Sequence, residues 1–224
     1  MKTPSLFMFN IPQGKSMRRS VMFPVVIQGN LVTFATVSHA VEHVGGEYEM
    51  VIANASGEIL PAQTTKTKVV VIPVETGADL AFVQVEIDSP PSAVRFSDRR
   101  IKKGEPLSHA RNVMFRKEFK DQVFEVTTQN SAPLSGKRFT FENGDYFDTQ
   151  EQKKFLGMVR ANPLKGLSIR SWPGVSGSPL WDKFGNVLGM VCGGNVELSE
   201  KHPNFFLVYL PAKEIKRYLQ VFIK

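Results

Sequence analysis

Residues 20–37 read SVMFPVVIQGNLVTFATV, two apolar runs rich in β-branched residues that are joined by Gly29-Asn30. β-branched residues favour strands, because their side chains pack well on a pleated surface. A glycine-containing dipeptide between two such runs is typical of the tight turn in a hairpin. The segment therefore predicts two antiparallel strands, over residues 20–28 and 31–37.

The rest of the chain repeats this pattern of short apolar segments. They are separated by many of the 17 glycines and 14 prolines, and helical periodicity is nearly absent until the end. This pattern favours an all-β protein. Further strands are expected over residues 47–54, 66–74, 80–87, 106–115, 121–128, 155–162, 167–171, 179–181, 187–192 and 205–210. Apolar residues at 215, 219 and 222 share one helical face, which predicts a C-terminal helix over residues 211–223.

A proline-rich and then charged stretch, residues 89–104, divides the chain into two halves of similar length. Prolines followed by basic residues are typical of an exposed connection. We expect one β domain in residues 1–100 and a second in residues 101–224, the second ending in the helix. Residues 131–152 are polar and rich in turn formers, which predicts a long surface loop or hairpin.

Composition excludes several classes of protein. With 42% hydrophobic residues in 224, the chain is neither disordered nor of low complexity. The single cysteine, Cys192, excludes an intramolecular disulfide and a zinc site built on cysteine pairs. The apolar runs are far shorter than the roughly 20 residues of a membrane span, and Pro4 and Asn10 interrupt the only segment resembling a signal peptide. We expect a soluble protein of a reducing compartment.

The charge balance leaves one question open. There are 28 Lys and Arg against 21 Asp and Glu, a net charge of +7, which is compatible with weak nucleic-acid binding. The basic residues are nevertheless scattered, and no basic motif interleaved with aromatic residues of the RNA-binding type is present. A solvated basic surface is the favoured interpretation.

Three segments place a polar residue beside an apolar run, where a rigid scaffold presents it for chemistry. They are TVSHA at residues 36–40, GADLA at 77–81 and PGVSGSP at 173–179, and they hold His39, Asp79 and Ser176. A serine hydroxyl needs an imidazole to take its proton, and the imidazole needs a carboxylate to fix its tautomer. The chain therefore supplies a nucleophile, a base and an orienting acid.

These motifs resemble those of chymotrypsin-like serine proteases, in the chain order His, Asp, Ser. The resemblance covers most of the chain and implies two six-stranded antiparallel β-barrels with the active site between them. It implies that His39 is the general base, Asp79 its orienting acid and Ser176 the nucleophile. The backbone N–H groups of Gly174 and Ser176 would form the oxyanion hole, and the substrate would be a polypeptide cleaved through an acyl-enzyme. This chemistry implies neither a metal nor an organic cofactor.

One departure from the family pattern concerns activation. Secreted animal enzymes carry Asp directly before the nucleophile, where it pairs with a new N-terminus, but this chain has Val175. Activation through such a salt bridge is therefore not expected. With the absence of disulfides, this favours viral or bacterial intracellular relatives, a cytoplasmic location, and a role in polyprotein processing or regulation.

The resemblance also suggests the walls of a specificity pocket. Residues 189–194, GMVCGG, are expected to form one wall, with Val191, Cys192 and Gly193 near the substrate. Viral proteases selective for glutamine carry His where Val191 falls, which argues against a glutamine pocket. Arg170 lies six residues before Ser176, near the base of the pocket in the family, and suggests a preference for acidic side chains.

Other assignments fit less well. An α/β-hydrolase requires Gly-x-Ser-x-Gly, and the second glycine is missing after Ser176. Cys192 lies inside an apolar run, which favours a buried inert thiol over a nucleophile. Two non-enzymatic hypotheses stay open: a protease-like fold that binds RNA or an acidic protein partner, and a structural or capsid-type β protein.

Overall fold

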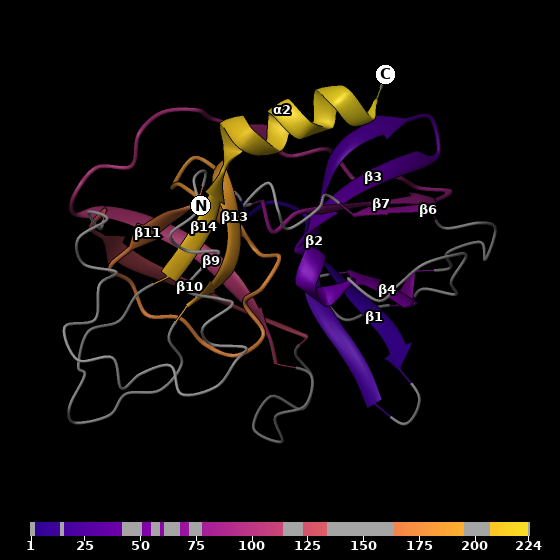
Figure 1. Ribbon diagram of the computed structural model, residues 1–224, viewed down its shortest axis with the longest axis horizontal. Coiled ribbons are helices and arrows are strands. Elements are labelled where there is room, and N and C mark those ends of the chain that lie inside the picture. Colours follow the sequence, from indigo (N-terminus) through magenta and orange to yellow (C-terminus); the bar gives the residue numbers. More distant parts are fainter. Residues whose placement is uncertain are drawn as a thin grey trace.

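The computed structural model describes residues 3–13, 16–41, 51–54, 59–60, 68–71, 78–113, 123–133, 164–194 and 207–223. Within these residues the chain forms two sheets of seven strands each, antiparallel except for one parallel pair in the second sheet, and an α-helix at the C-terminus (Figure 1). The expected all-β class with a C-terminal helix is confirmed. Each sheet has seven strands where the family resemblance implied six, and each includes one strand of only two residues.

The first sheet holds the strands of the N-terminal half, in the order β5-β4-β1-β2-β3-β7-β6. Their bounds are β1 Phe7–Gln13, β2 Ser16–Gln28, β3 Leu31–Thr36, β4 Val51–Asn54, β5 Ile59–Leu60, β6 Lys68–Val71 and β7 Ala81–Glu86. The predicted hairpin is β2 and β3, which pair up to Gln28 and Leu31 around Gly29 in the left-handed conformation, φ 61°. Glycine adopts this conformation without steric cost.

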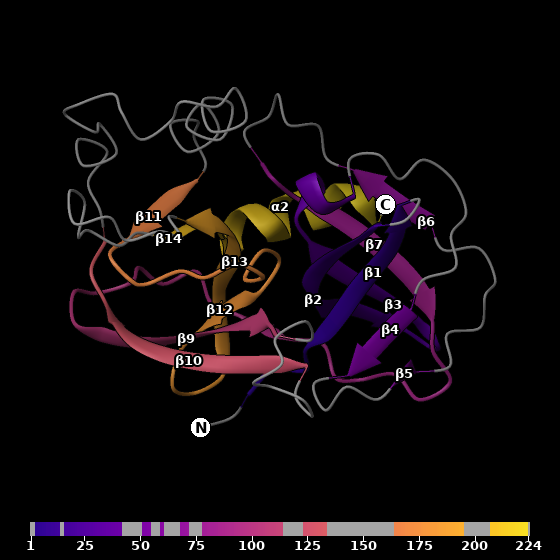
Figure 2. The ribbon, with the colours of Figure 1, turned by 90° about the horizontal axis from the view of Figure 1, so that it is seen from below.

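The second sheet holds the strands of the C-terminal half, in the order β10-β9-β12-β13-β14-β11 (Figure 2). Strand β8, from the connection between the halves, pairs in parallel with β13. Their bounds are β8 Arg95–Phe96, β9 Glu105–Asn112, β10 Phe124–Ser131, β11 Lys165–Leu167, β12 Pro179–Trp181, β13 Asn186–Gly194 and β14 Leu207–Pro211. A bridge between Pro133 and Leu167 connects the β10 edge to β11 and so closes this sheet on itself.

Strand alternation builds three apolar clusters, one within each sheet and one between the two sheets. In β3, Val32 and Phe34 belong to the cluster inside the first sheet, whereas Ala35 faces the cluster between the sheets. Successive side chains of a strand point to opposite faces, so both faces of β3 are buried. The cluster between the sheets includes Phe23 from β2 and Trp181 from β12. This shared core holds the two halves together.

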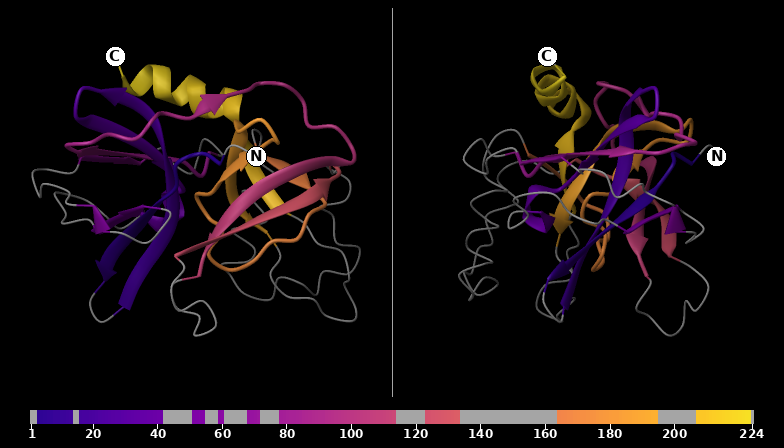
Figure 3. Two further views of the ribbon diagram at one scale, coloured as in Figure 1. Left: turned by 180° about the vertical axis from the view of Figure 1, so that it is seen from behind. Right: turned by 90° about the vertical axis from the view of Figure 1, so that its right-hand side faces the viewer.

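Helix α2, Ala212–Phe222, also joins the halves. It follows β14 and lies across both sheets (Figures 1 and 3). Ile215 and Leu219 enter the cluster between the sheets, and Phe222 stacks on Phe82 of β7 with ring centroids 5.3 Å apart. The predicted helix is confirmed, with Pro211 as its N-cap residue.

The remaining predictions divide into three groups. Strands are present within or overlapping most of the expected segments, but β1, β5 and β8 were not predicted. The expected strand over 155–162 and most of the expected loop over 131–152 lie outside the described residues. Among the residues that are described, no helix combines the length and apolar composition that a membrane span requires.

Candidate active site

His39 lies in a short 3-10 helix, η1 (Ser38–Ala40), that follows β3 directly. Its side chain is 43% exposed, and its Nδ1 lies 2.7 Å from Oδ2 of Asp79. An ionised carboxylate only accepts hydrogen bonds, so Nδ1 carries the hydrogen and donates it. In the neutral ring this leaves Nε2 as the basic nitrogen.

Asp79 is buried, with 1% of its surface exposed, and lies two residues before β7. Because β7 pairs with β3, the start of β7 and the end of β3 are neighbours, which brings Asp79 beside η1. Its Oδ1 accepts hydrogen bonds from the Ser38 hydroxyl at 2.8 Å and from the His39 backbone N–H at 3.0 Å. Both carboxylate oxygens are therefore occupied.

The protonation of Asp79 follows from these contacts. Burial alone raises the pKa of a carboxyl group, because it disfavours the charged form. The hydrogen bonds from His39 and Ser38, together with the charge of His39, outweigh burial and hold the pKa of Asp79 below its ordinary value. Asp79 is thus ionised at neutral pH and holds the imidazole in one tautomer.

Ser176 belongs to the second half but is anchored to the first sheet. Its carbonyl oxygen accepts hydrogen bonds from the backbone N–H of Val21 at 3.0 Å and from the Ser20 hydroxyl at 2.9 Å. The Ser20 hydroxyl also lies 2.8 Å from the hydroxyl of Thr36, the last residue of β3. The loop that holds Ser176, residues 173–179, is called the nucleophile loop below. Because Thr36 stands three residues before His39, this network places the nucleophile loop beside the His39 segment.

Gly177 allows this close approach. Its φ is +82°, and a Cβ at this position would lie 1.9 Å from the carbonyl oxygen of Val21. No side chain fits there, so a glycine is required directly after Ser176. The loop and the first sheet are therefore in backbone contact at the residue that follows the nucleophile.

The predicted oxyanion donors lie in the same loop. Gly174 has φ +88°, and its carbonyl oxygen accepts a hydrogen bond from the backbone N–H of Asn112 at 2.9 Å. The Ser178 N–H donates to the carbonyl oxygen of Val175 at 3.0 Å, which closes the turn around Ser176. Within the described part of the chain, the N–H groups of Gly174 and Ser176 have no backbone acceptor.

The residues predicted to contact substrate differ in exposure. Val191 and Cys192 are buried, with 0% and 1% of their surfaces exposed, whereas Gly193 is half-buried. Arg170 is exposed, with its guanidinium 5.2 Å from the ring centroid of Trp172. Burial raises the pKa of the Cys192 thiol well above its ordinary value, as expected for an inert thiol.

Three contributors to this site were not predicted: Ser20, Thr36 and Ser38. Thr36 and Ser38 flank the apolar Val37 in the same segment as His39, which was the available signal. Ser20 carries no signal, because its partner Ser176 is 156 residues away in the sequence. No group of three potential metal ligands is found among the described residues.

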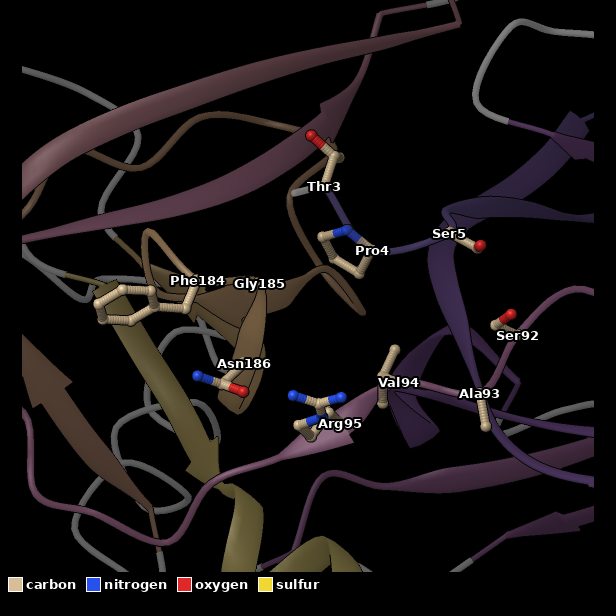
Figure 4. A pocket seen from close by; sticks show the side chains of 10 residues that line it. All are labelled: Thr3, Pro4, Ser5, Ser92, Ala93, Val94, Arg95, Phe184, Gly185 and Asn186. Atoms are coloured by element: carbon tan, nitrogen blue, oxygen red, sulfur yellow. The ribbon is translucent and has the colours of Figure 1, made fainter. Parts of the chain in front are cut away.

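A separate cavity of about 340 Å³ lies away from these residues (Figure 4). It is lined by the N-terminal segment around Pro4, by the connection around Arg95, and by the β12–β13 turn at Phe184. None of the predicted site residues lines it. The cavity is therefore distinct from the site around His39.

Comparison with known proteins agrees with this geometry. Residues 25–190 match the family model of the trypsin-like peptidase domain, well over half of the chain. The Rv3671c protease from M. tuberculosis in its active form is 19% identical with a TM-score of 0.58, and the match covers 97% of this chain and 79% of that chain. An inactive serine-to-alanine mutant of Rv3671c is 15% identical with a TM-score of 0.55, covering 98% and 87%. At these identities the likeness shows the fold alone. No curated protein matches the sequence.

Proposed function

Since the chain belongs to the trypsin-like peptidase family, we propose that it is a serine endopeptidase in which His39, Asp79 and Ser176 form the catalytic triad. The observation that carries the proposal is the contact between Asp79 and His39. A buried carboxylate accepts hydrogen bonds from the ring, from the backbone of the same histidine and from Ser38. Such an arrangement fixes the tautomer and orientation of a partly exposed imidazole, as a general base requires.

The proposed reaction has two stages. His39 Nε2 takes the proton of the Ser176 hydroxyl as Oγ attacks the substrate carbonyl, and the carbonyl oxygen becomes an oxyanion held by the N–H groups of Gly174 and Ser176. The protonated His39 then gives its proton to the leaving amine, which leaves an acyl-enzyme. A water molecule, deprotonated by His39, hydrolyses this ester and restores Ser176.

The substrate we propose is a polypeptide. Arg170 is exposed and near the nucleophile in sequence, which supports a preference for acidic side chains next to the cleaved bond. We propose a processing or regulatory role in a reducing compartment, and the single buried, free cysteine is compatible with such a compartment.

The test is covalent labelling with a fluorophosphonate probe, followed by mass spectrometry of the adduct. We expect one adduct on Ser176 in the wild-type protein and none in Ser176→Ala. His39→Ala should remove labelling while leaving the circular dichroism spectrum unchanged. Absence of an adduct on a protein shown to be folded would overturn the proposal and favour a binding module.

A further inference from the structure

Two arginines from different parts of the second half contact the ring of Trp172. The guanidinium carbons of Arg111 and Arg170 each lie 5.2 Å from its centroid. The two arginines differ in their surroundings, because Arg170 is exposed whereas the Arg111 side chain is only 9% exposed. Arg111 also forms an ion pair with Glu125, its cross-strand partner on β10. Arg111 is therefore held between the Trp172 ring and Glu125.

Strand β9, which carries Arg111, forms hydrogen bonds with the nucleophile loop on both sides of Ser176. The backbone N–H of Ala110 donates to the Ser178 hydroxyl at 2.7 Å, and the N–H of Asn112 donates to the Gly174 carbonyl at 2.9 Å. Arg111 stands between these two residues. Its side chain adds a third contact, through Trp172, directly before the same loop.

The residue directly before Ser176 is Val175, whose apolar side chain cannot form an ion pair. Val175 is 2% exposed and belongs to the apolar cluster inside the second sheet, with Trp172 packed against that cluster. Val175 is therefore held by packing rather than by a charge. Trp172 and Val175 therefore share one apolar cluster, which connects the contact with Arg111 to the loop.

We propose that Arg111 is a positioning residue which, fixed by Glu125, holds Trp172 and so keeps the N–H groups of Gly174 and Ser176 aligned for the oxyanion. This inference rests on the proposed serine peptidase function. It implies an oxyanion hole that is formed in the folded chain without a proteolytic activation step. Loss of one oxyanion donor typically lowers kcat by about 10²–10³, so partial misalignment of both donors is measurable.

The test compares Arg111→Met with a control of the same kind. Arg217 lies over the ring of Tyr218 at 4.8 Å and pairs with Glu214 at 3.0 Å, so Arg217→Met removes the same types of contact far along the chain, on helix α2. Saturating fluorophosphonate labelling separates the maximal rate of Ser176 phosphonylation from the affinity for the probe. We expect Arg111→Met to lower the maximal rate about tenfold or more, with affinity within about threefold, and Arg217→Met to change neither.

Further measurements separate positioning from folding. Arg111→Lys keeps a charge for Glu125 but not the planar group over Trp172, so its rate should fall between those of wild type and Arg111→Met. Melting temperatures exclude unfolding at the labelling temperature. Equal rates for Arg111→Met and wild type, or equal losses in both methionine variants, would overturn the inference.

Hydrogen exchange gives a readout that does not need activity. The amide of Asn112 is protected by its bond to Gly174, so it should exchange faster in Arg111→Met, whereas amides of helix α2 should not change. If wild type fails to label but Asn112 responds, the proposed function fails and the positioning role stands. An unchanged Asn112 amide would overturn the positioning role alone.

Discussion

The thiol of Cys192 contacts the backbone of Asp79, with its Sγ 3.9 Å from the backbone oxygen of that residue. The cysteine is fully enclosed, and burial together with the charge of Asp79 raises the pKa of its thiol well above the ordinary range. A protonated, enclosed thiol is neither a nucleophile nor accessible to reagents.

We therefore expect native protein to retain its activity when it is treated with iodoacetamide at pH 7.5, and Cys192 to react only after unfolding. Cys192→Ala should keep kcat/KM within about threefold, at a stability cost of about 1 kcal/mol for the lost packing. Mass spectrometry of the native and denatured protein measures the alkylation. Loss of activity in Cys192→Ala with full activity in Ser176→Ala would reverse the assignment of the nucleophile.

Replacing Asp79 by Asn keeps the shape of the side chain but turns an acceptor into a partial donor. His39 would then no longer be held with its hydrogen on Nδ1. In chymotrypsin-like serine proteases the corresponding change lowers kcat by about 10⁴. We expect a loss of that size for Asp79→Asn, with little change in KM. Steady-state kinetics on a fluorogenic peptide measures it, and a loss of less than about tenfold would exclude Asp79 as the orienting acid.

Ser38→Ala tests one of the three donors to Asp79. Removing this hydrogen bond raises the pKa of Asp79 toward its ordinary value, because the hydrogen bond favours the charged form. A carboxyl group with a lowered pKa in the folded state stabilises the protein above its unfolded pKa and loses this contribution as the pH falls through the folded value. Ser38→Ala should therefore lose about 2 kcal/mol at pH 7 and unfold at a higher pH on acidification. Acid unfolding followed by circular dichroism measures the shift, and coincident curves would contradict it.

The hairpin around Gly29 and the helix after Pro211 were predictable because their signals are local. A turn dipeptide between β-branched runs, or apolar residues at helical spacing, needs no knowledge of distant contacts. Strand β1 was missed because Asn10 and Pro12 interrupt its pattern, although it pairs along its whole length with β2. Tertiary pairing overrides weak local preference in that segment.

The candidate site was likewise predictable from the sequence only in part. The order and spacing of His39, Asp79 and Ser176 are visible in the sequence, and the structure places a hydrogen bond between the first two. The anchor of Ser176 on Ser20 was not predictable, because it joins residues 156 positions apart through a backbone oxygen that every residue possesses. Contacts of this kind depend on how the two sheets pack.

Gly177 and Gly104 provide a matched pair for testing the contact between the loop and the first sheet. Both have left-handed backbones, with φ of +82° and +79°, but a Cβ on Gly104 meets nothing within 4 Å. Gly104→Ala should cost only the strain of its backbone, about 1 kcal/mol. Gly177→Ala should cost about 3 kcal/mol or more and slow fluorophosphonate labelling about a hundredfold, because the loop must move away from Val21. Similar melting temperatures and labelling rates in the two variants would contradict this contact.

His109 gives the protein a specific sensitivity to acid. It is fully buried on β9, near the ring of Trp172 at 5.7 Å and near Gln129, with Arg111 and Glu125 as the charged groups that act on it. Burial lowers the pKa of His109 from 6.5 to about 4, because the charged ring would lose its hydration. The folded state therefore keeps this ring neutral at a pH where the unfolded chain takes up a proton.

The sign of the effect follows from this difference. The contribution is fully present above pH 6.5 and is lost as the pH falls toward 4, by up to about 3 kcal/mol at 1.4 kcal/mol per pH unit. We expect His109→Gln, which cannot take up a proton, to lose less stability than wild type between pH 7 and pH 4.5. Urea unfolding at both pH values measures the free energies, and the difference between the proteins isolates His109 from the other histidines. Equal losses in the two proteins would show that His109 takes up its proton in the folded state as readily as in the unfolded chain.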